Sequence, residues 1–372
     1  MDHKTQALDL LGKRGSEITQ KHAMVGFDGL VERVTSVVDK RLGQGDAFAR
    51  VETIEAFASK ILDAAGSGTG LEIFPREEKA GGNGPVMAGA LGKAGLNMRY
   101  VGALGEASVH PVFAKFAQDT DAISIADPAI IHALEFADGN IMLGELVSLD
   151  GITYRNLLSQ MTEGEFFDLL SRQDLVSVVN WAIIPNLTTL LTDLLDYVIP
   201  NLPPRDQKHY FFDLSDTEKR SDGEVRSVLS TISRFQNWGA VTLGLKLEEA
   251  GRVTQLLGQS KMGDDADGLK SMAAYTRDHL SIGTAVVHSG DSAACATKLE
   301  TAWVEGPVTK DAPAKRGATE HFHAGFCLAQ LLDFPLPASL ATGMAFRGFH
   351  GRMGRSPSMS EAQSFIQYWK DA

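Results

Sequence analysis

A short segment near the C-terminus has the residue types and the spacing that phosphate chemistry needs. Gly317, Ala318, Thr319 and Glu320 lead directly into the helical pattern HFHAGFCLAQLL. The free backbone N–H groups at a helix start, together with the helix dipole, bind anions such as phosphate. A carboxylate in the first turn, here Glu320, is positioned to deprotonate an attacking hydroxyl. The alternative is an ordinary acidic first turn without a catalytic role.

Carboxylates and glycines also occur at the ends of predicted elements in the first hundred residues. The apolar run AMVGFDGLVERV predicts a core strand, and Asp28 and Glu32 lie near its end. Functional residues tend to follow such strands, although both side chains are equally compatible with solvated loop carboxylates. Gly81, Gly82 and Asn83 precede a helical pattern, and a lone glycine cluster there is typical of a turn.

The remaining elements predict how these residues are positioned. The apolar strands VSVVNWAII, HYFFDL, AVTLGL and TAVVHS alternate with amphipathic helical stretches. This alternation favours an α/β fold with a mostly parallel sheet and helices on both faces. Residues 131–150 contain two strand-like runs around Asp138-Gly139, which is a strong hairpin signal. We expect this hairpin to form part of a lid beside the larger sheet.

Composition limits the classes of partner. The chain has 372 residues, 44% of them apolar, and a formal net charge of −12 without a dense Lys/Arg run, which argues against binding nucleic acid or an anionic membrane surface. No apolar stretch approaches the roughly 18 residues of a membrane span, and the N-terminal residues lack the apolar core of a secretory signal. We therefore expect a cytoplasmic protein. Cys295 and Cys327 are too few for a disulfide framework and are expected to be buried thiols.

Two other kinds of site are not favoured. His321 and His323 are two residues apart on a predicted helix, so they should point to different sides and not share a metal ion. The G-x-G-x-x-G pattern of a dinucleotide-binding fold is missing after the first predicted strand.

The C-terminal segment resembles a signature of the PfkB, or ribokinase-like, carbohydrate kinases. That signature reads G-A-G-D, a variable residue, Phe, another variable residue, Ala-Gly. The residues in register with it are Gly317, Ala318, Phe322, Ala324 and Gly325. Thr319 replaces the second Gly, and Glu320 replaces the Asp. The resemblance implies that Glu320 is the catalytic base and that the backbone of Gly317, Ala318 and Thr319 forms an anion hole.

The sugar-binding side of the same family is matched less completely. The glycine pair before a helix resembles the family's N-terminal signature, and the first strand resembles its opening strand. The residues that this resemblance places at the sugar are Asp28, Glu32, Gly81, Gly82 and Asn83. Val86 stands where the family has a sugar-binding Asn, and Ala107 stands where it has an Asp.

On the nucleotide side, Lys246-Leu247-Glu248-Glu249 resembles the family's Asn-x-x-Glu motif, which is associated with Mg²⁺ and phosphate. Glu249 is retained, which implies a role at the metal, and Lys246 replaces the Asn as a possible phosphate contact. A helix-opening Lys is also commonly just solvated. His288 and Gly290 fall where the family's nucleotide-side loop begins, and residues 341–351 fall on its adenine-side helix.

The resemblance covers roughly residues 24–356 in motif order and implies a ribokinase-like fold. We expect one domain over residues 1–372, with a small β lid formed by parts of residues 28–50 and 120–155. The implied activity is phosphorylation of a hydroxyl on a sugar or sugar-like molecule, with ATP as phosphate donor and Mg²⁺ as cofactor. Lid-mediated dimers in similar proteins make a homodimer possible. The altered motif leaves an alternative, a catalytically degenerate homologue that binds a ligand or acts in regulation.

Overall fold

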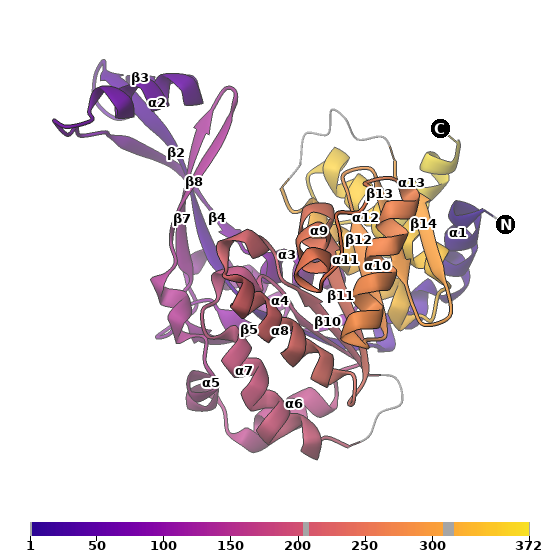
Figure 1. Cartoon of the computed structure of the whole chain (residues 1–372). Coiled ribbons are helices and arrows are strands. Elements are labelled where there is room, and N and C mark those ends of the chain that lie inside the picture. Colours follow the sequence, from indigo (N-terminus) through magenta and orange to yellow (C-terminus); the bar gives the residue numbers. More distant parts are fainter. Residues whose placement is uncertain (1, 204–207, 308–315, 372) are drawn as a thin grey trace.

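The computed structural model of the chain describes residues 2–203, 208–307 and 316–371. These residues form a nine-stranded sheet in the body and a five-stranded sheet that projects from it (Figure 1). The order in the body is β14-β13-β12-β11-β10-β9-β1-β5-β6. The bounds of these strands are β1 His22–Phe27, β5 Asn97–Ala103, β6 Ile123–Ala126, β9 Leu175–Val178, β10 His209–Asp213, β11 Ala240–Lys246, β12 Thr284–His288, β13 Ser292–Ala296 and β14 Thr301–Glu305.

Most of the body sheet is parallel. All neighbours from β12 to β6 in this order run parallel, and only β13 and β14 at one edge are antiparallel. Side chains alternate between two hydrophobic cores: Ala23 and Val25 of β1 pack on one face, and Met24 and Phe27 pack on the other. Because both faces are buried, the strands are continuous apolar runs, as predicted from the sequence.

Helices cover both faces of this sheet (Figure 1). The helices on the first face are α1 His3–Arg14, α3 Asn83–Lys93, α4 Ala114–Asp119, α11 Ala318–Leu331, α12 Leu336–Met353 and α13 Met359–Asp371. Those on the second face are α5 Tyr154–Gln160, α6 Glu163–Ser171, α7 Leu187–Asp193, α8 Asp222–Phe235, α9 Leu247–Leu256 and α10 Ala266–Leu280. The predicted α/β architecture is confirmed.

The second sheet forms a lid, visible at the upper left of Figure 1. Its order is β3-β2-β7-β8, and β4 also pairs with β2. The bounds are β2 Leu30–Arg41, β3 Phe48–Arg50, β4 Ile73–Gly81, β7 Ala129–Phe136 and β8 Gly139–Glu145, with helix α2 Ile54–Asp63. The apolar side of α2 closes a small separate core formed by Val37, Val51, Phe57, Leu134 and Phe136.

The lid differs in detail from the segments expected to form it. The hairpin predicted at Asp138-Gly139 is present, because β7 and β8 pair antiparallel with Phe136 opposite Gly139. Asp138 also accepts a hydrogen bond of 2.9 Å from the backbone N–H of Ile54, which ties the turn to the start of α2. Beyond residues 28–50 and 120–155, the lid includes α2 and β4. Strand β6, by contrast, lies in the body sheet.

Two smaller points concern the whole chain. Cys295 and Cys327 are buried free thiols, as predicted. Within the described ranges, no helix combines the length and the apolar character that crossing a bilayer requires.

Candidate active site

Polar residues gather where the parallel strands of the body end. Asp28 directly follows β1, Asn180 follows β9 by two residues, and Asp213, Lys246 and His288 are the last residues of β10, β11 and β12. Neighbouring strands are paired up to these ends, with Lys246 opposite His288. Because parallel strands present their carboxyl ends at one edge, the fold brings together residues up to 260 positions apart.

Asp28 holds the glycine-rich start of α3. The backbone N–H groups of Asn83 and Gly84 each donate to its carboxylate at 2.8 Å, and the side-chain amide of Asn180 donates at 2.6 Å. A side chain at Gly82, where φ is 107°, or at Gly84 would approach the Asp28 oxygens to below 3 Å, so both positions require glycine. Both oxygens of Asp28 are occupied and the residue is buried.

The burial of Asp28 also affects its ionisation. Burial raises the pKa of Asp28 to about 6, against the opposing effect of the hydrogen bonds from Asn180, Gly84 and Asn83. Sequence reasoning gave Asp28 as a candidate sugar ligand beside Glu32. In the structure, its contacts hold the α3 loop.

A chain of hydrogen bonds continues from this loop to the end of β10. The side chain of Asn83 donates to the hydroxyl of Ser215 at 2.8 Å, and Ser215 donates through its hydroxyl and its backbone N–H to Asp213. On the other side of Asp213, Nδ1 of His323 lies 3.2 Å from the second carboxylate oxygen, with both side chains buried. Asn83 is thus joined to α11 through Ser215 and Asp213, which sequence reasoning did not identify.

Helix α11 begins with the predicted anion-binding segment. Gly317 is its N-cap with φ 83°, a conformation that favours glycine, and a side chain there would also press against His350 and Val86. The first intrahelical bond runs from the N–H of His321 to the carbonyl of Gly317. The N–H groups of Ala318, Thr319 and Glu320 precede it and have no acceptor within the helix.

Glu320 is the buried acid of this first turn. Burial raises the pKa of Glu320 to about 7, and the nearby negative charges of Asp213 and Asp28 act in the same direction. Its own backbone N–H and the positive charge of Lys246 act in the opposite direction. A carboxyl group with a pKa near neutrality is suited to accept a proton from a substrate and release it again.

A cavity of about 890 Å³ lies between the lid and the body, next to this helix start. It is lined by six of the residues predicted for the site: Glu32, Gly81, Gly82, Asn83, Gly317 and Glu320. Sequence reasoning missed the other polar residues of its wall, which are Lys79, Glu135, Asn140, Arg316 and His350. The cavity therefore joins the proposed base to the proposed sugar-binding glycines and to the lid.

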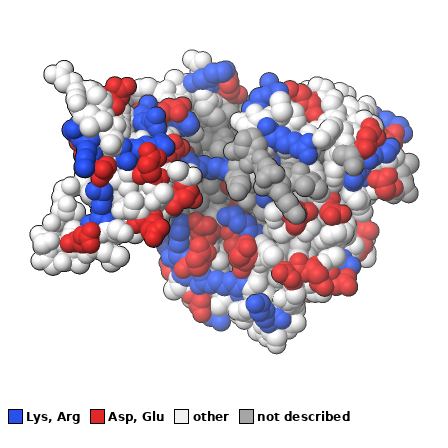
Figure 2. Space-filling view, turned by 90° about the horizontal axis from the view of Figure 1, so that it is seen from above, with Lys and Arg blue, Asp and Glu red and all other residues white. Residues whose placement is uncertain are grey.

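One ion pair links the lid to the start of α11. Arg316 donates to the carboxylate of Glu32 on β2, and its other terminal nitrogen lies 3.1 Å from the sulfur of Met142 on β8. Figure 2, which views the molecule from above, shows acidic and basic side chains interleaved on lid and body, so the described part of this face has mixed charge. Glu32 is thus both a cavity residue and the lid's anchor for Arg316.

Beside Glu320, a second group of charges surrounds Lys246. Its ammonium lies 3.6 Å from Asp216 and 3.6 Å from Glu249. Burial alone would lower the pKa of Lys246, but Glu249, Asp213 and other carboxylates outweigh it and raise the pKa. Burial and the charge of Asp213 hold the pKa of Glu249 well above its ordinary range.

Glu249 has one oxygen available for a ligand. Its Oε2 accepts a hydrogen bond of 2.9 Å from the backbone N–H of Lys246, whereas its buried Oε1 has no hydrogen-bond partner. Mg²⁺ in phosphate sites keeps most of its waters and needs only one or two protein carboxylates. An orphaned carboxylate oxygen next to an ammonium fits a hydrated Mg²⁺ with a phosphate. In the described ranges, no three His, Cys, Asp or Glu side chains form a closed metal cluster.

The two residues predicted for the nucleotide-side loop lie apart from the cavity. His288 is buried, with its ring 4.6 Å from Phe322 and 5.0 Å from His323, and neither of its ring nitrogens has a hydrogen-bond partner. Burial, with the charge of His323, lowers its pKa well below the ordinary value. Gly290 is exposed, and its carbonyl accepts a hydrogen bond from Arg347 of α12. His288 therefore contacts the helix that carries Glu320, not open solvent.

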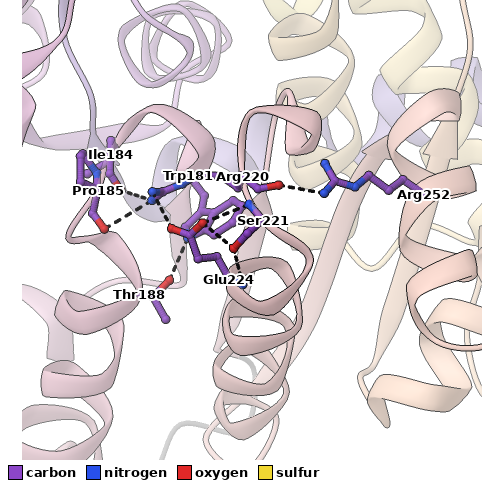
Figure 3. Close-up of polar contacts among 8 residues, drawn as sticks. All are labelled: Trp181, Ile184, Pro185, Thr188, Arg220, Ser221, Glu224 and Arg252. Carbon is purple, nitrogen blue, oxygen red and sulfur yellow. Dashed lines mark hydrogen bonds and ion pairs between the residues drawn. The ribbon is translucent and has the colours of Figure 1, made fainter.

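A network on the opposite face of the sheet fixes the loops that follow the strands (Figure 3). Arg220 lies over the ring of Trp181 at 4.9 Å and donates to the carbonyls of Ile184 and Pro185. Arg252 of α9 donates in turn to the carbonyl of Arg220 at 2.8 Å. The network joins the segments after β9 and β10 to α9, and so restrains the loop that holds Asp216.

Comparisons with known proteins show the family to which the chain belongs. A family model described as prokaryotic ketohexokinase matches residues 4–369. The chain belongs to the prokaryotic ketohexokinase family. A ketohexokinase of Haloferax volcanii is 28% identical over 352 residues, which cover 94% of this chain and 91% of that protein. The family is one of carbohydrate kinases, so the sequence resemblance to such kinases is confirmed.

Solved structures share the fold at low sequence identity. A carbohydrate kinase from Agrobacterium tumefaciens is 16% identical, with a TM-score of 0.63 and coverage of 93% of this chain and 97% of that one. A ribokinase of Arabidopsis thaliana, complexed with ribose and ATP, is 13% identical, with a TM-score of 0.62 and coverage of 93% and 98%. The ribokinase-like fold class predicted from the sequence is confirmed.

Proposed function

We propose that this protein transfers the γ-phosphoryl group of ATP, in the presence of Mg²⁺, to a hydroxyl of a ketohexose. The observation that carries the proposal is the position of Glu320. It lies in the wall of a polar cavity, in the first turn of a helix whose free N–H groups are adjacent. A base and an anion hole side by side are the two parts that hydroxyl phosphorylation requires. We propose a ketohexose as the acceptor because the matching family is described as prokaryotic ketohexokinase.

Glu320 acts as the base. Its pKa of about 7 means that a large fraction is ionised at neutral pH and can accept the proton of the attacking hydroxyl. The proton passes from the sugar oxygen to the carboxylate as that oxygen bonds to the γ-phosphorus, and the bond between this phosphorus and the ADP oxygen breaks to release ADP. Exclusion of water by the lid strengthens the interaction of this carboxylate with the hydroxyl.

Charge on the transferring phosphoryl group is stabilised from two sides. The N–H groups of Gly317, Ala318 and Thr319 lie at the positive end of the α11 dipole and donate to its oxygens. The ammonium of Lys246 supplies a full positive charge close to Glu320 and contacts a phosphate as a point charge. Thr319 adds a half-buried side chain beside this backbone, where the family signature has Gly.

Mg²⁺, when bound with ATP, neutralises charge that develops on the phosphate oxygens. Glu249 would hold the hydrated ion through Oε1, which accepts no hydrogen bond and lies 3.6 Å from the Lys246 ammonium, while its Oε2 stays bonded to the backbone of Lys246. His288 and Gly290 then have different roles in the nucleotide site: Gly290 lies on its exposed surface, and His288 supports α11 from below.

The sugar hydroxyls are bound from the floor and the lid of the cavity. A side chain at Gly81 would meet Glu32, and one at Gly82 would meet Asp28, so both positions require glycine. Without side chains there, the sugar can come close to the backbone. Asn83, Glu32 and the lid residue Asn140 offer polar groups around the same space. Asp28 contributes indirectly by holding the start of α3.

A coupled assay of ADP formation tests the proposal. Purified protein is incubated with ATP and Mg²⁺ against fructose, other ketohexoses, aldohexoses, ribose, nucleosides and sugar phosphates, with omission of Mg²⁺ as a control. We expect ADP formation that depends on a ketohexose and on Mg²⁺, and that is lost in Glu320→Gln. Binding of sugar and nucleotide without turnover over the whole panel would instead favour a degenerate binding protein and contradict the proposal.

A further inference from the structure

Two histidines stack directly behind the start of α11. The rings of His321, from α11, and His350, from α12, are 3.8 Å apart and inclined by only 13°. Both side chains are buried. His321 lies at a variable position of the kinase signature, and neither ring has a part in the reaction proposed above.

Each ring binds one backbone carbonyl of the segment before the anion hole. Nδ1 of His321 lies 2.6 Å from the carbonyl oxygen of Gly317, and Nε2 of His350 lies 2.7 Å from the carbonyl oxygen of Arg316. A carbonyl oxygen only accepts, so each of these ring nitrogens carries the proton. The other nitrogen of His321 accepts from the hydroxyl of Ser356 at 2.9 Å, which fixes this tautomer.

These two contacts determine where the next N–H groups point. In a planar trans peptide, the carbonyl of one residue and the N–H of the following residue point in opposite directions. Fixing the carbonyl of Arg316 therefore fixes the N–H of Gly317, and fixing the carbonyl of Gly317 fixes the N–H of Ala318. Both N–H groups are directed away from the histidine pair.

We infer that His321 and His350 are positioning residues that aim the Gly317 and Ala318 N–H groups at the transferring phosphoryl group. The inference rests on the proposed function of this helix start as an anion hole. Gly317 has a left-handed backbone without a side chain to restrain it. The first intrahelical bond, from the N–H of His321, holds its carbonyl in part, and the two rings add to that restraint. Donors that are aimed before the reaction stabilise the transition state without reorganisation.

Substitutions of similar size distinguish the effect of the hydrogen bond from that of the ring's bulk. His350→Leu fills the space but removes the donor, whereas His350→Gln keeps an N–H at nearly the same reach as Nε2. His321→Leu and His321→Asn form the corresponding pair, since the Asn amide lies near the position of Nδ1. His279→Leu is the matched control, because His279 also stacks on a ring and bonds the carbonyl four residues earlier, but on the exposed side of α10.

Steady-state kinetics and stability are measured for all five variants. We expect kcat of each Leu variant to fall by roughly 10- to 100-fold, the scale for misaligned or missing transition-state donors, with KM for sugar and ATP within about threefold of wild type. His350→Gln and His321→Asn should recover most of kcat, and His279→Leu should match wild type. Unchanged kcat in the Leu variants, or equal losses in the Leu and amide variants, would overturn the inference.

The two proposals fail in different ways. If wild-type protein phosphorylates no sugar, the proposed function is wrong, and the positioning role is decided by hydrogen exchange of the Gly317 and Ala318 amides. We then expect faster exchange in His350→Leu than in wild type and His350→Gln. Equal exchange in all three proteins overturns the positioning role. If wild-type protein is active and His350→Leu is equally active while folded, only the positioning inference is wrong.

Discussion

Replacing Glu320 by glutamine tests both its burial and its role as the base. The substitution keeps the size of the side chain but removes the ionisable group. Burial, reinforced by Asp213 and Asp28, raises the pKa of Glu320 from 4.5 to about 7. The folded protein therefore binds this proton more tightly than the unfolded chain, and the resulting stability is present below pH 4.5 and is lost as pH rises through about 7.

The magnitude follows from the change in pKa. Each pKa unit corresponds to about 1.4 kcal/mol, so ionisation of Glu320 lowers the free energy of unfolding of the wild type by about 3 kcal/mol above pH 7. Glu320→Gln has no such loss. Relative to wild type, we expect the variant to be more stable by up to about 3 kcal/mol at pH 8 and nearly unchanged at pH 4.5 to 5.

Urea denaturation at pH 5 and pH 8 measures this difference, and the ADP assay measures turnover of the same samples. We expect kcat of Glu320→Gln to fall by at least about 100-fold with little change in KM, because a contact made in the transition state is lost. Glu55→Gln is the control, since Glu55 also lies in a first helical turn but is exposed. A variant without extra stability at pH 8 would refute the argument from burial, and one with parental turnover would refute the role as base.

Three further substitutions test other titratable groups near Glu320 and the start of α11. Glu249→Gln should weaken Mg²⁺-dependent ATP binding, measured by calorimetry, by about 10-fold or more. Stability should not fall, because the amide oxygen still accepts from the Lys246 N–H. Unchanged affinity would exclude Glu249 from the metal site. Lys246→Met should move the acidic limb of the pH–kcat profile to higher pH, since the charge of Lys246 lowers the pKa of Glu320, and an unmoved limb would contradict this coupling. His321→Asn should flatten the loss of stability between pH 6.5 and 4. Burial, with the charge of His350, lowers the pKa of His321 from 6.5 to about 4. Protonation of the unfolded chain therefore lowers the free energy of unfolding of the wild type by up to about 3 kcal/mol as pH falls over this range. The same pH dependence of urea denaturation in variant and wild type would refute this prediction.

The body of the fold was predictable because its signals are local. Strands buried on both faces are short apolar runs, and the residues that follow them in the chain also meet in space. The Asp138-Gly139 hairpin was predictable from its turn residues, and the left-handed Gly317 marks the start of α11. The residues selected by these local signals, Glu320 and the Gly81-Gly82 pair, line the same cavity in the structure.

The composition of the lid was not predictable in the same way. Strand β4 is exposed over most of its length and carries Arg76, Glu77, Glu78 and Lys79 in succession. The sequence predicts a short strand over residues 71–77, and charged side chains protect such a strand from pairing with other molecules. They also remove the alternation of apolar and polar residues that would show which face is buried and how far the strand extends. As a result, Lys79 was not anticipated in the wall of the cavity.

The buried network behind Glu320 was not predictable because it depends on tertiary contacts. Asp213, Ser215 and His323 carry no spacing signal, and they meet only when β10 packs under α11. His321 and His323 were expected on different sides of the helix. The structure confirms this, since one ring contacts His350 and the other contacts Asp213.

Two of the departures from the kinase signatures, Glu320 and Lys246, interact electrostatically. A buried Glu320 near Asp213 and Asp28 would be largely protonated at neutral pH if no cation lay nearby, and a protonated carboxyl group cannot act as a base. Lys246 supplies that cation, where the family pattern has a neutral Asn. The ammonium opposes the rise in the pKa of Glu320 that burial, Asp213 and Asp28 cause, in the same direction as the hydrogen bond from the backbone N–H of Glu320.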